Sequence, residues 1–311
     1  MDLHTVREVL EVGGLEEVEK RGEVRGARGR LGWRTGDAWL GGGTYLFSEP
    51  QPGVRRLLDL SRTGWEPFRW LPDGALEIAA TCTVAEVSRF GGSGGGGGGW
   101  LPVGVLFEQC CRAFLASFKI WNTATVGGNL CLALPAAPMV SLTAALDGTC
   151  LLLAVDGTAR RLPVADLVTG PGRNALAEGE LLRSVTLPAR ALERRTAFRQ
   201  TSLYGLGRSA ALLIGTRDPV DGAFTLTITA ATVRPVRLRF PEPPSPSELR
   251  AAIGRAVPDD GWFDDVHGMP EWRRHMTYRM GEEIREELAG AEPRRGRPGR
   301  GGAFAGAVPV G

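Results

Sequence analysis

The stretch Ile120-Trp121-Asn122-Thr123-Ala124-Thr125-Val126-Gly127-Gly128-Asn129-Leu130 decides the interpretation of this chain. The two glycines allow a ligand to approach the backbone closely, because neither carries a side chain. Thr125 and Asn129 flank the pair and add uncharged hydrogen-bonding groups. This combination suits the ribityl and pyrophosphate region of a flavin dinucleotide, a large and partly apolar ligand. The stretch therefore predicts a flavin-binding segment.

No charged residue occurs between Ile120 and Leu146, a length that could cross a membrane. The run contains Gly127, Gly128, Pro135 and Pro138, which would leave backbone groups unpaired in lipid, so a membrane span is not expected. A buried cofactor lined by this run explains the missing charges instead. We expect its continuation, Ala133–Pro138, to be extended.

A second glycine-rich segment is Trp39-Leu40-Gly41-Gly42-Gly43-Thr44-Tyr45. Ala38–Leu40 indicates a short buried strand that opens into a turn, where successive backbone N–H groups can converge on a phosphate. A tight turn without a ligand explains these glycines about as well. The segment has no GxGxxG pattern and is not a Rossmann fingerprint.

Composition excludes several other classes of protein. The 311 residues are 43% hydrophobic and carry a net charge of +2, so neither nucleic-acid binding nor disorder of the whole chain is indicated. The charged N-terminus is no secretory signal, which favours the cytoplasm. The cysteines show no paired spacing and, with three histidines, form no metal or iron–sulfur ligand set: Cys82, Cys110, Cys111, Cys131 and Cys150.

Local patterns predict alternating helices and strands. We expect helices over Leu3–Val12, Val84–Phe90, Phe107–Phe118 and Glu271–Leu288, and a weaker, short helix over Glu16–Arg21. Thr83 and Glu86 would form a capping box at the start of the helix over Val84–Phe90. The expected strands are Arg56–Leu60, Leu76–Ala80, a hairpin over Leu151–Val164, Leu181–Leu187, Thr196–Thr201, Ala210–Thr216 and Phe224–Val233. Three segments are expected to separate or end these elements: a flexible glycine loop at 91–99, a domain boundary at 190–195, and a disordered tail at 290–311.

Both glycine-rich segments resemble the FAD motifs of the flavoprotein subunits of molybdenum hydroxylases, the xanthine dehydrogenase and carbon monoxide dehydrogenase family. In that family the two motifs have approximately the sequences AGGTDL and IRNxATIGGNLxxASPAAD. The similarity continues at Gly179–Pro188, at Phe198–Gln200 and, faintly, at Glu271-Trp272-Arg273, which is similar to the family's "eYR". The resemblance therefore covers Val6 to about Leu288.

The resemblance implies an α+β fold with two domains. Residues 1–190 would form a two-subdomain FAD-binding domain of the vanillyl-alcohol oxidase (PCMH) type, and residues 195–289 a small α+β domain. The glycine turn would hold the pyrophosphate, with Leu115 and Ala116 near the adenosine and Leu182 and Arg199 near the flavin. The implied FAD-binding residues are Leu40, Gly41, Gly42, Gly43, Thr44, Tyr45, Leu115, Ala116, Ala124, Thr125, Gly127, Gly128, Asn129, Leu182 and Arg199.

By this resemblance the chain would be an oxidoreductase subunit with FAD as its cofactor. It would pass electrons from iron–sulfur clusters on a small partner subunit, next to a molybdenum-cofactor large subunit, to NAD or another acceptor. The chain itself supplies no catalytic acid or base and no metal ligand. Two alternatives remain: a flavin-free or degenerate assembly subunit of the same complex, and a free-standing FAD-dependent oxidase.

Four positions depart from the family's motifs. Tyr45 stands at the acidic position of AGGTDL, Trp121 at the arginine, Leu134 at the serine and Pro138 at the last aspartate. A proline offers neither a side-chain acceptor nor a backbone N–H. Loss of that aspartate removes about 1.5–3 kcal/mol of charge-assisted hydrogen bonding, so we expect weaker FAD binding than in relatives. These four positions keep the flavin-free alternative open.

Overall fold

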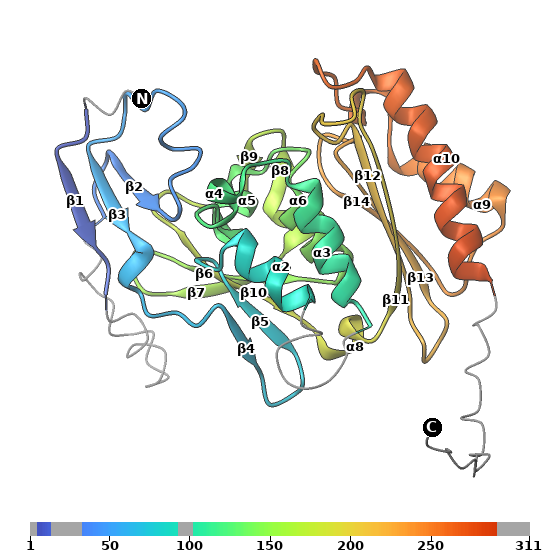
Figure 1. The fold of residues 1–311 in the computed structure, drawn as a ribbon, viewed down its shortest axis with the longest axis horizontal. Helices are drawn as coiled ribbons and strands as arrows, with labels where there is room; N and C mark the ends of the chain where they lie inside the picture. Colours follow the sequence, from blue (N-terminus) through green and yellow to red (C-terminus); the bar gives the residue numbers. More distant parts are fainter. Residues whose placement is uncertain (1–4, 14–32, 93–101, 291–311) are drawn as a thin grey trace, which may run out of the picture.

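The computed structural model describes residues 5–13, 33–92 and 102–290. Helices and strands are mixed along the chain, and three main sheets follow one another across the molecule (Figure 1). A two-stranded ribbon, β8 (Val168–Gly170) with β9 (Arg173–Asn174), is separate from them. Within the described ranges no helix is long and apolar enough to cross a membrane.

The first sheet is small and parallel. Its order is β1 (Glu8–Glu11), β3 (Arg56–Asp59) and β2 (Asp37–Leu40). The expected strands at 38–40 and 56–60 are confirmed, but the helix expected over Leu3–Val12 is wrong. Glu8–Glu11 pairs in parallel with Arg56–Asp59, and this long-range pairing outweighs the local pattern because it satisfies the backbone groups of both strands. The short helix considered for Glu16–Arg21 lies outside the described residues.

The second sheet is antiparallel and carries four of the expected strands. Its order is β4 (Phe68–Trp70), β5 (Leu76–Ala79), β10 (Leu181–Leu187), β6 (Thr149–Leu153) and β7 (Ala159–Pro163). The predicted hairpin is confirmed as β6 and β7. Strand β10 has the predicted bounds, and all but one of its residues are buried.

Helices cover this sheet and fill the space beyond it. They are α2 (Val84–Gly92), α3 (Gly104–Ala113), α4 (Phe118–Trp121), α5 (Val126–Leu132), α6 (Pro138–Ala145), α7 (Val164–Leu167) and α8 (Ala189–Leu192). A 3-10 turn, η2 (Leu60–Arg62), follows β3 of the first sheet. The capping box of α2 is confirmed: Glu86 accepts from the backbone of Thr83, and Thr83 accepts from the backbone of Glu86. The glycine loop expected from residue 91 begins later, because Gly91 and Gly92 complete α2; its remainder lies outside the described residues.

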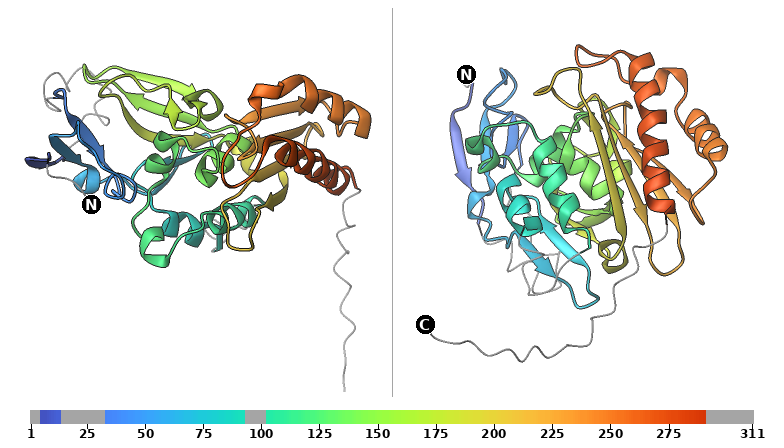
Figure 2. Two further views of the ribbon diagram at one scale, coloured as in Figure 1. Left: turned by 90° about the horizontal axis from the view of Figure 1, so that it is seen from above. Right: turned by 45° about the vertical axis from the view of Figure 1, so that its right-hand side comes forward.

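The third sheet forms the C-terminal part of the molecule. Its order is β11 (Arg195–Thr201), β12 (Ala211–Arg217), β13 (Phe224–Thr229) and β14 (Val236–Phe240), all antiparallel. Helices α9 (Pro246–Ala256) and α10 (Pro270–Ala289) cover its outer face, with a 3-10 turn, η3 (Asp259–Gly261), between them (Figure 2). The helix expected at 271–288 is confirmed. The tail expected after residue 290 lies outside the described residues.

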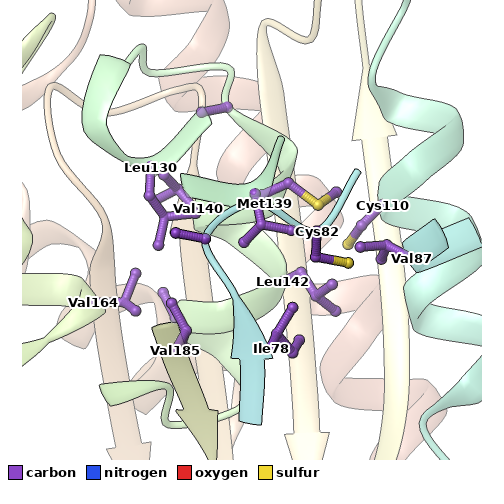
Figure 3. Close-up of a cluster of buried hydrophobic side chains, with 14 of the residues drawn as sticks. Ile78, Cys82, Val87, Cys110, Leu130, Met139, Val140, Leu142, Val164 and Val185 are labelled. Atoms are coloured by element: carbon purple, nitrogen blue, oxygen red, sulfur yellow. The ribbon is translucent and has the colours of Figure 1, made fainter. Parts of the chain in front are cut away.

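Helix α6 packs between the second and third sheets. All eight of its residues are buried. Met139, Val140 and Leu142 lie among side chains from the second sheet, including Ile78 and Val185 (Figure 3). Toward the third sheet, the hydroxyl of Ser141 is 2.7 Å from that of Thr229 on β13. Core packing, rather than a cofactor, therefore explains why the second half of the uncharged run lacks charge.

Two further expectations about this region are wrong. The helix expected over Phe107–Phe118 ends at Ala113, because the Phe114 carbonyl accepts from the indole of Trp121 (2.9 Å) instead of continuing the helix. The extended continuation expected over Ala133–Pro138 gives way to α6 at Pro138. Proline is favoured in the first turn of a helix, where its missing N–H costs no hydrogen bond.

Candidate functional site

The two glycine-rich segments, far apart in the sequence, pack against each other. A Cβ on Gly42 would lie 1.6 Å from the carbonyl oxygen of Thr123, and one on Gly41 would lie 3.0 Å from the hydroxyl of Thr125. Only glycine fits at position 42, because the obstructing atom belongs to the backbone. The triple glycine thus brings the turn after β2 directly onto the segment that leads into α5.

This turn presents unused hydrogen-bond donors. Among the described residues, no acceptor takes the backbone N–H groups of Gly41 to Tyr45. These residues line a hollow of about 310 Å³ together with Ala124, Thr125, Gly128 and Asn129. Consecutive backbone donors at the edge of a hollow form a site suited to an anion.

The backbone N–H groups around the glycine pair of α5 find acceptors within the protein. Thr125 caps the helix by accepting from the N–H of Gly128 (3.0 Å), while the N–H groups of Val126 and Gly127 donate to Cys82 and Ala80. The backbone donors of this helix start are therefore already used by the protein. Among the described residues that line the cleft, the glycine turn after β2 is the segment whose consecutive N–H groups have no acceptor.

The two glycines face opposite environments. A Cβ on Gly127 would lie 2.6 Å from the Cβ of Ala80 and 2.8 Å from its carbonyl oxygen, so Gly127 serves the close packing of α5 on the end of β5. At Gly128 the nearest atom to such a Cβ is the Thr125 hydroxyl, at 3.0 Å, and Gly128 lines the cleft. Gly127 is needed by the core, whereas Gly128 lines the cleft.

The hollow at the glycine turn continues in two directions and makes one cleft. Toward β10 it adjoins a small apolar hollow of about 130 Å³, the β10 hollow, which Trp39, Leu176 and Leu182 help to line. Toward the third sheet it adjoins a larger hollow of about 450 Å³, the junction hollow. The three hollows share residues at each junction, including Thr44, Asn129, Thr125 and Gly128.

Two walls enclose the junction hollow. The N-terminal wall is largely apolar: Phe114, Leu115, Ile120, Leu132, Leu134 and Pro135–Pro138. The C-terminal wall is polar and includes Arg208, Ser209, Asp265, His267 and Arg273. The sequence singled out only Arg273 of this wall, within Glu271-Trp272-Arg273 and without a role in the site. The other members lie on separate loops that the tertiary fold brings together.

Ionisable groups along the cleft differ in their environment. Burial raises the pKa of the Cys131 thiol to about 12, so this cleft-lining cysteine is a neutral thiol at physiological pH. Burial also lowers the pKa of the Arg273 guanidinium, although Asp265 opposes that shift. Within the described residues, no three His, Cys, Asp or Glu side chains gather closely enough to hold a metal ion.

Two of the four departures from the family motifs have local structural roles. Trp121 holds the turn at Phe114 through its indole N–H, as described above. Pro138 begins α6, and the next N–H, that of Met139, donates to the side-chain oxygen of Asn129 (3.0 Å). Asn129 thus joins the cleft to the first turn of α6. Tyr45 and Leu134 line the cleft.

Most of the sequence-predicted site residues come together around this cleft, and two do not. Leu40, Gly41–Tyr45, Ala124, Thr125 and Gly127–Asn129 line it, Leu115 lies on its junction side and Leu182 on its β10 side. Ala116 is exposed beside Leu115 and is outside the lining. Arg199 points to α10 and pairs with Glu283 (3.1 Å) and Glu287 (2.7 Å), away from the cleft.

Residues 72–190 match the family described as the FAD binding domain in molybdopterin dehydrogenase. The match includes Leu115, Gly127–Asn129 and Leu182, whereas the glycine turn and Arg199 lie outside it. No curated protein matches the chain.

Solved structures resemble the chain over nearly its full length. Quinoline 2-oxidoreductase from Pseudomonas putida 86 has a TM-score of 0.70 and 18% identity, over 93% of this chain and 98% of that chain. Carbon monoxide dehydrogenase from Hydrogenophaga pseudoflava has a TM-score of 0.68 and 16% identity, over 91% and 97%. Reconstituted CO dehydrogenase from Oligotropha carboxidovorans has a TM-score of 0.68 and 17% identity, over 93% and 99%. At these identities the likeness establishes a shared fold.

Proposed function

We propose, from the match of residues 72–190 to the FAD binding domain in molybdopterin dehydrogenase, that the chain is the FAD-binding, electron-transferring subunit of a molybdenum-containing dehydrogenase. Bound FAD would supply the redox chemistry, while the protein supplies binding, orientation and electrostatics. We further propose that the first two sheets and their helices are the two subdomains of a PCMH-type domain within residues 1–190, and that residues 195–289 form the second domain.

One observation carries this proposal: the N–H groups of Gly41 to Tyr45, which no acceptor among the described residues takes, lie at the middle of a cleft with a further hollow toward each end. An elongated dinucleotide has a charged pyrophosphate at its centre and a ring system at each end. The turn would accept the pyrophosphate, Thr125 and Asn129 would flank it, and Gly128 leaves the space that a side chain would fill. The residues present therefore fit FAD.

The unequal hollows favour one orientation of the dinucleotide. The β10 hollow of about 130 Å³ suits the smaller adenine, whereas the junction hollow of about 450 Å³ suits the three-ring isoalloxazine. This is the reverse of the orientation expected from the resemblance, in which Leu182 lies by the flavin and Leu115 by the adenosine. Leu182→Trp tests the choice: it should weaken ADP binding in our orientation and leave ADP binding intact in the other.

We propose that the electrons come from iron–sulfur clusters on a small partner subunit, that a molybdenum-cofactor subunit completes the complex, and that NAD or another molecule accepts the electrons. The family description names molybdopterin enzymes, and the similar structures include carbon monoxide dehydrogenases. The partners can be tested by expressing the chain with its genomic neighbours and analysing what co-purifies. Substrate turnover by the isolated, metal-free chain would instead favour a free-standing oxidase.

A flavin-free assembly subunit is the second candidate. The observation that favours it is Pro138, which is buried at the start of α6 and offers no acceptor to a ligand hydroxyl. The absorbance spectrum of the purified protein after incubation with FAD separates the two candidates. Two visible flavin bands that persist through gel filtration support the proposed function, whereas a folded protein that takes up no flavin supports the assembly subunit.

A further inference from the structure

Arg273 on α10 is the largest side chain that the described core buries fully, at 1% exposure. Burying a guanidinium is unfavourable unless hydrogen bonds and an opposite charge replace the lost water. Arg273 also belongs to the segment Glu271-Trp272-Arg273, which is similar to a family motif. The proposed FAD site gives this segment no role. The contacts of Arg273 therefore indicate what the buried charge is for.

The guanidinium connects three separate loops. Its Nε donates to the carbonyl of Gly268 (2.8 Å), and its Nη1 donates to the carbonyls of Ala210 (2.6 Å) and Ala230 (2.6 Å). Its Nη2 pairs with the carboxylate of Asp265. These acceptors lie on the loops that precede β12, follow β13 and precede α10.

The same three loops make the C-terminal wall of the junction hollow. Arg208 and Ser209 precede Ala210, Ala230 lines the hollow itself, and Phe263, Asp265 and His267 lie on the loop that ends at Gly268. The wall is also connected to the opposite side, because the N–H of Ala230 donates to the carbonyl of Pro135 (2.8 Å). One side chain thus connects every segment that this wall contributes.

The backbone around Arg273 is adapted to its presence. A Cβ on Gly268 would lie 3.1 Å from the Nε of Arg273 and 3.2 Å from the Cβ of Ala210, so a larger residue there would crowd the guanidinium. Ala230 adopts a positive φ of 63°, a strained conformation for a residue with a side chain, while its carbonyl accepts from Arg273. A lysine could not replace this planar fork, because a single ammonium cannot reach acceptors on three sides.

We propose that Arg273 is a positioning residue that sets the width of the junction hollow and so selects a three-ring ligand over a smaller one. This inference rests on the proposed function, in which that hollow takes the isoalloxazine. Arg273 acts through the loops it connects. Helix α10, on the outer face of the third sheet, thereby takes part in a site formed by loops at the ends of β12 and β13.

The test compares the affinities of FAD and ADP for the flavin-free protein. Both ligands would use the glycine turn and the β10 hollow, but only FAD reaches the junction hollow. Arg273→Met should weaken FAD binding by about tenfold or more, leave ADP binding within about twofold, and change the visible circular dichroism of the bound flavin. Arg273→Lys should recover little of the loss. The matched control is Arg274→Met, since Arg274 is exposed, contacts Asp259 and the ring of Tyr278, and is not in the lining of the junction hollow.

Each outcome decides a separate point. Unchanged FAD affinity and circular dichroism in Arg273→Met would overturn the inference, and so would equal losses of FAD and ADP, which would mark a general role in folding. If Arg273→Met does not fold, Gly268→Ala takes its place with the same expected difference between FAD and ADP.

If the unaltered protein binds ADP but not FAD, or binds neither, the proposed function fails. In that case amide hydrogen exchange in the three loops tests the connecting role by itself. Faster exchange in Arg273→Lys than in the unaltered protein, with no such change in Arg274→Met, supports that role. Equal exchange in Arg273→Lys and the unaltered protein overturns it.

Discussion

Helices α5 and α6 share one uncharged stretch of sequence but lie in different surroundings. Helix α5 lies along the cleft, with Gly128 and Asn129 in its lining, whereas α6 is buried on all sides between two sheets. Both avoid charge because both are removed from water. The missing charges therefore predict burial, but not whether protein or a ligand covers the residues. Substitutions in the two helices should separate the two cases.

The largest effect is expected in α6. Leu142→Ala removes a fully buried side chain and should lower the free energy of unfolding by about 2–5 kcal/mol, because the surrounding core cannot collapse completely. The folded fraction should bind FAD at the usual stoichiometry. Urea unfolding and flavin titration measure the two quantities. A loss of FAD binding with unchanged stability would mean that α6 serves the cofactor after all.

The opposite pattern is expected in α5. Gly128→Val should weaken FAD binding by about a hundredfold, because the new side chain occupies the cleft, while the melting temperature changes little. Gly128→Ala should give an intermediate affinity. As the matched control, Gly127→Ala should instead lower stability, since its Cβ would meet the backbone of Ala80. If the two glycine positions responded alike, the assignment of one to the core and one to the cleft would be wrong.

A smaller effect should appear where the two helices meet. Asn129→Ala removes the acceptor for the N–H of Met139 and should lower stability by about 1 kcal/mol. Asn129→Asp keeps an acceptor oxygen and should retain most of that stability. Chemical unfolding of both variants measures the difference. Equal stabilities would show that this hydrogen bond contributes nothing to α6.

The smallest effect concerns the far end of α6, where Asp147 pairs with Arg194, Arg237 and Arg239. Burial opposes its ionisation, but Arg237 and Arg194 outweigh burial and hold the pKa of Asp147 below its ordinary value. The stabilisation is complete above the unfolded-state pKa of about 3.9 and is lost as pH falls through the lower folded-state pKa. The stability difference between the unaltered protein and Asp147→Asn should therefore shrink only in acid. A difference that is constant down to pH 3 would contradict this.

Sequence patterns were sufficient where the deciding interactions are local. The capping box at Thr83, the hairpin of β6 and β7 and the bounds of β10, which ends before Pro188, depend on residues that are close in the sequence. Helices α5 and α6 were missed because Gly127, Gly128 and Pro138 are typical helix breakers. The available signals were Thr125 as a cap and Pro138 as a first-turn proline.

Contacts between segments that are far apart in the sequence cannot be predicted from such local patterns. Strand β1 depends on pairing with a strand more than forty positions away, and the C-terminal wall depends on three loops that Arg273 connects. The two glycine segments could be predicted as site components from the sequence. Their mutual packing, and the use of the α5 donors by Cys82 and Ala80, depend on tertiary structure.

The burial of α6 between two sheets has a consequence for the order of events during synthesis. Ser141 and the residues around it emerge from the ribosome before β12 and β13 exist to cover them. Until then, one face of an uncharged helix is open to water and to other nascent chains. We therefore expect a chain stopped after β10 to be captured by chaperones or to aggregate, and translation of the third sheet to release it.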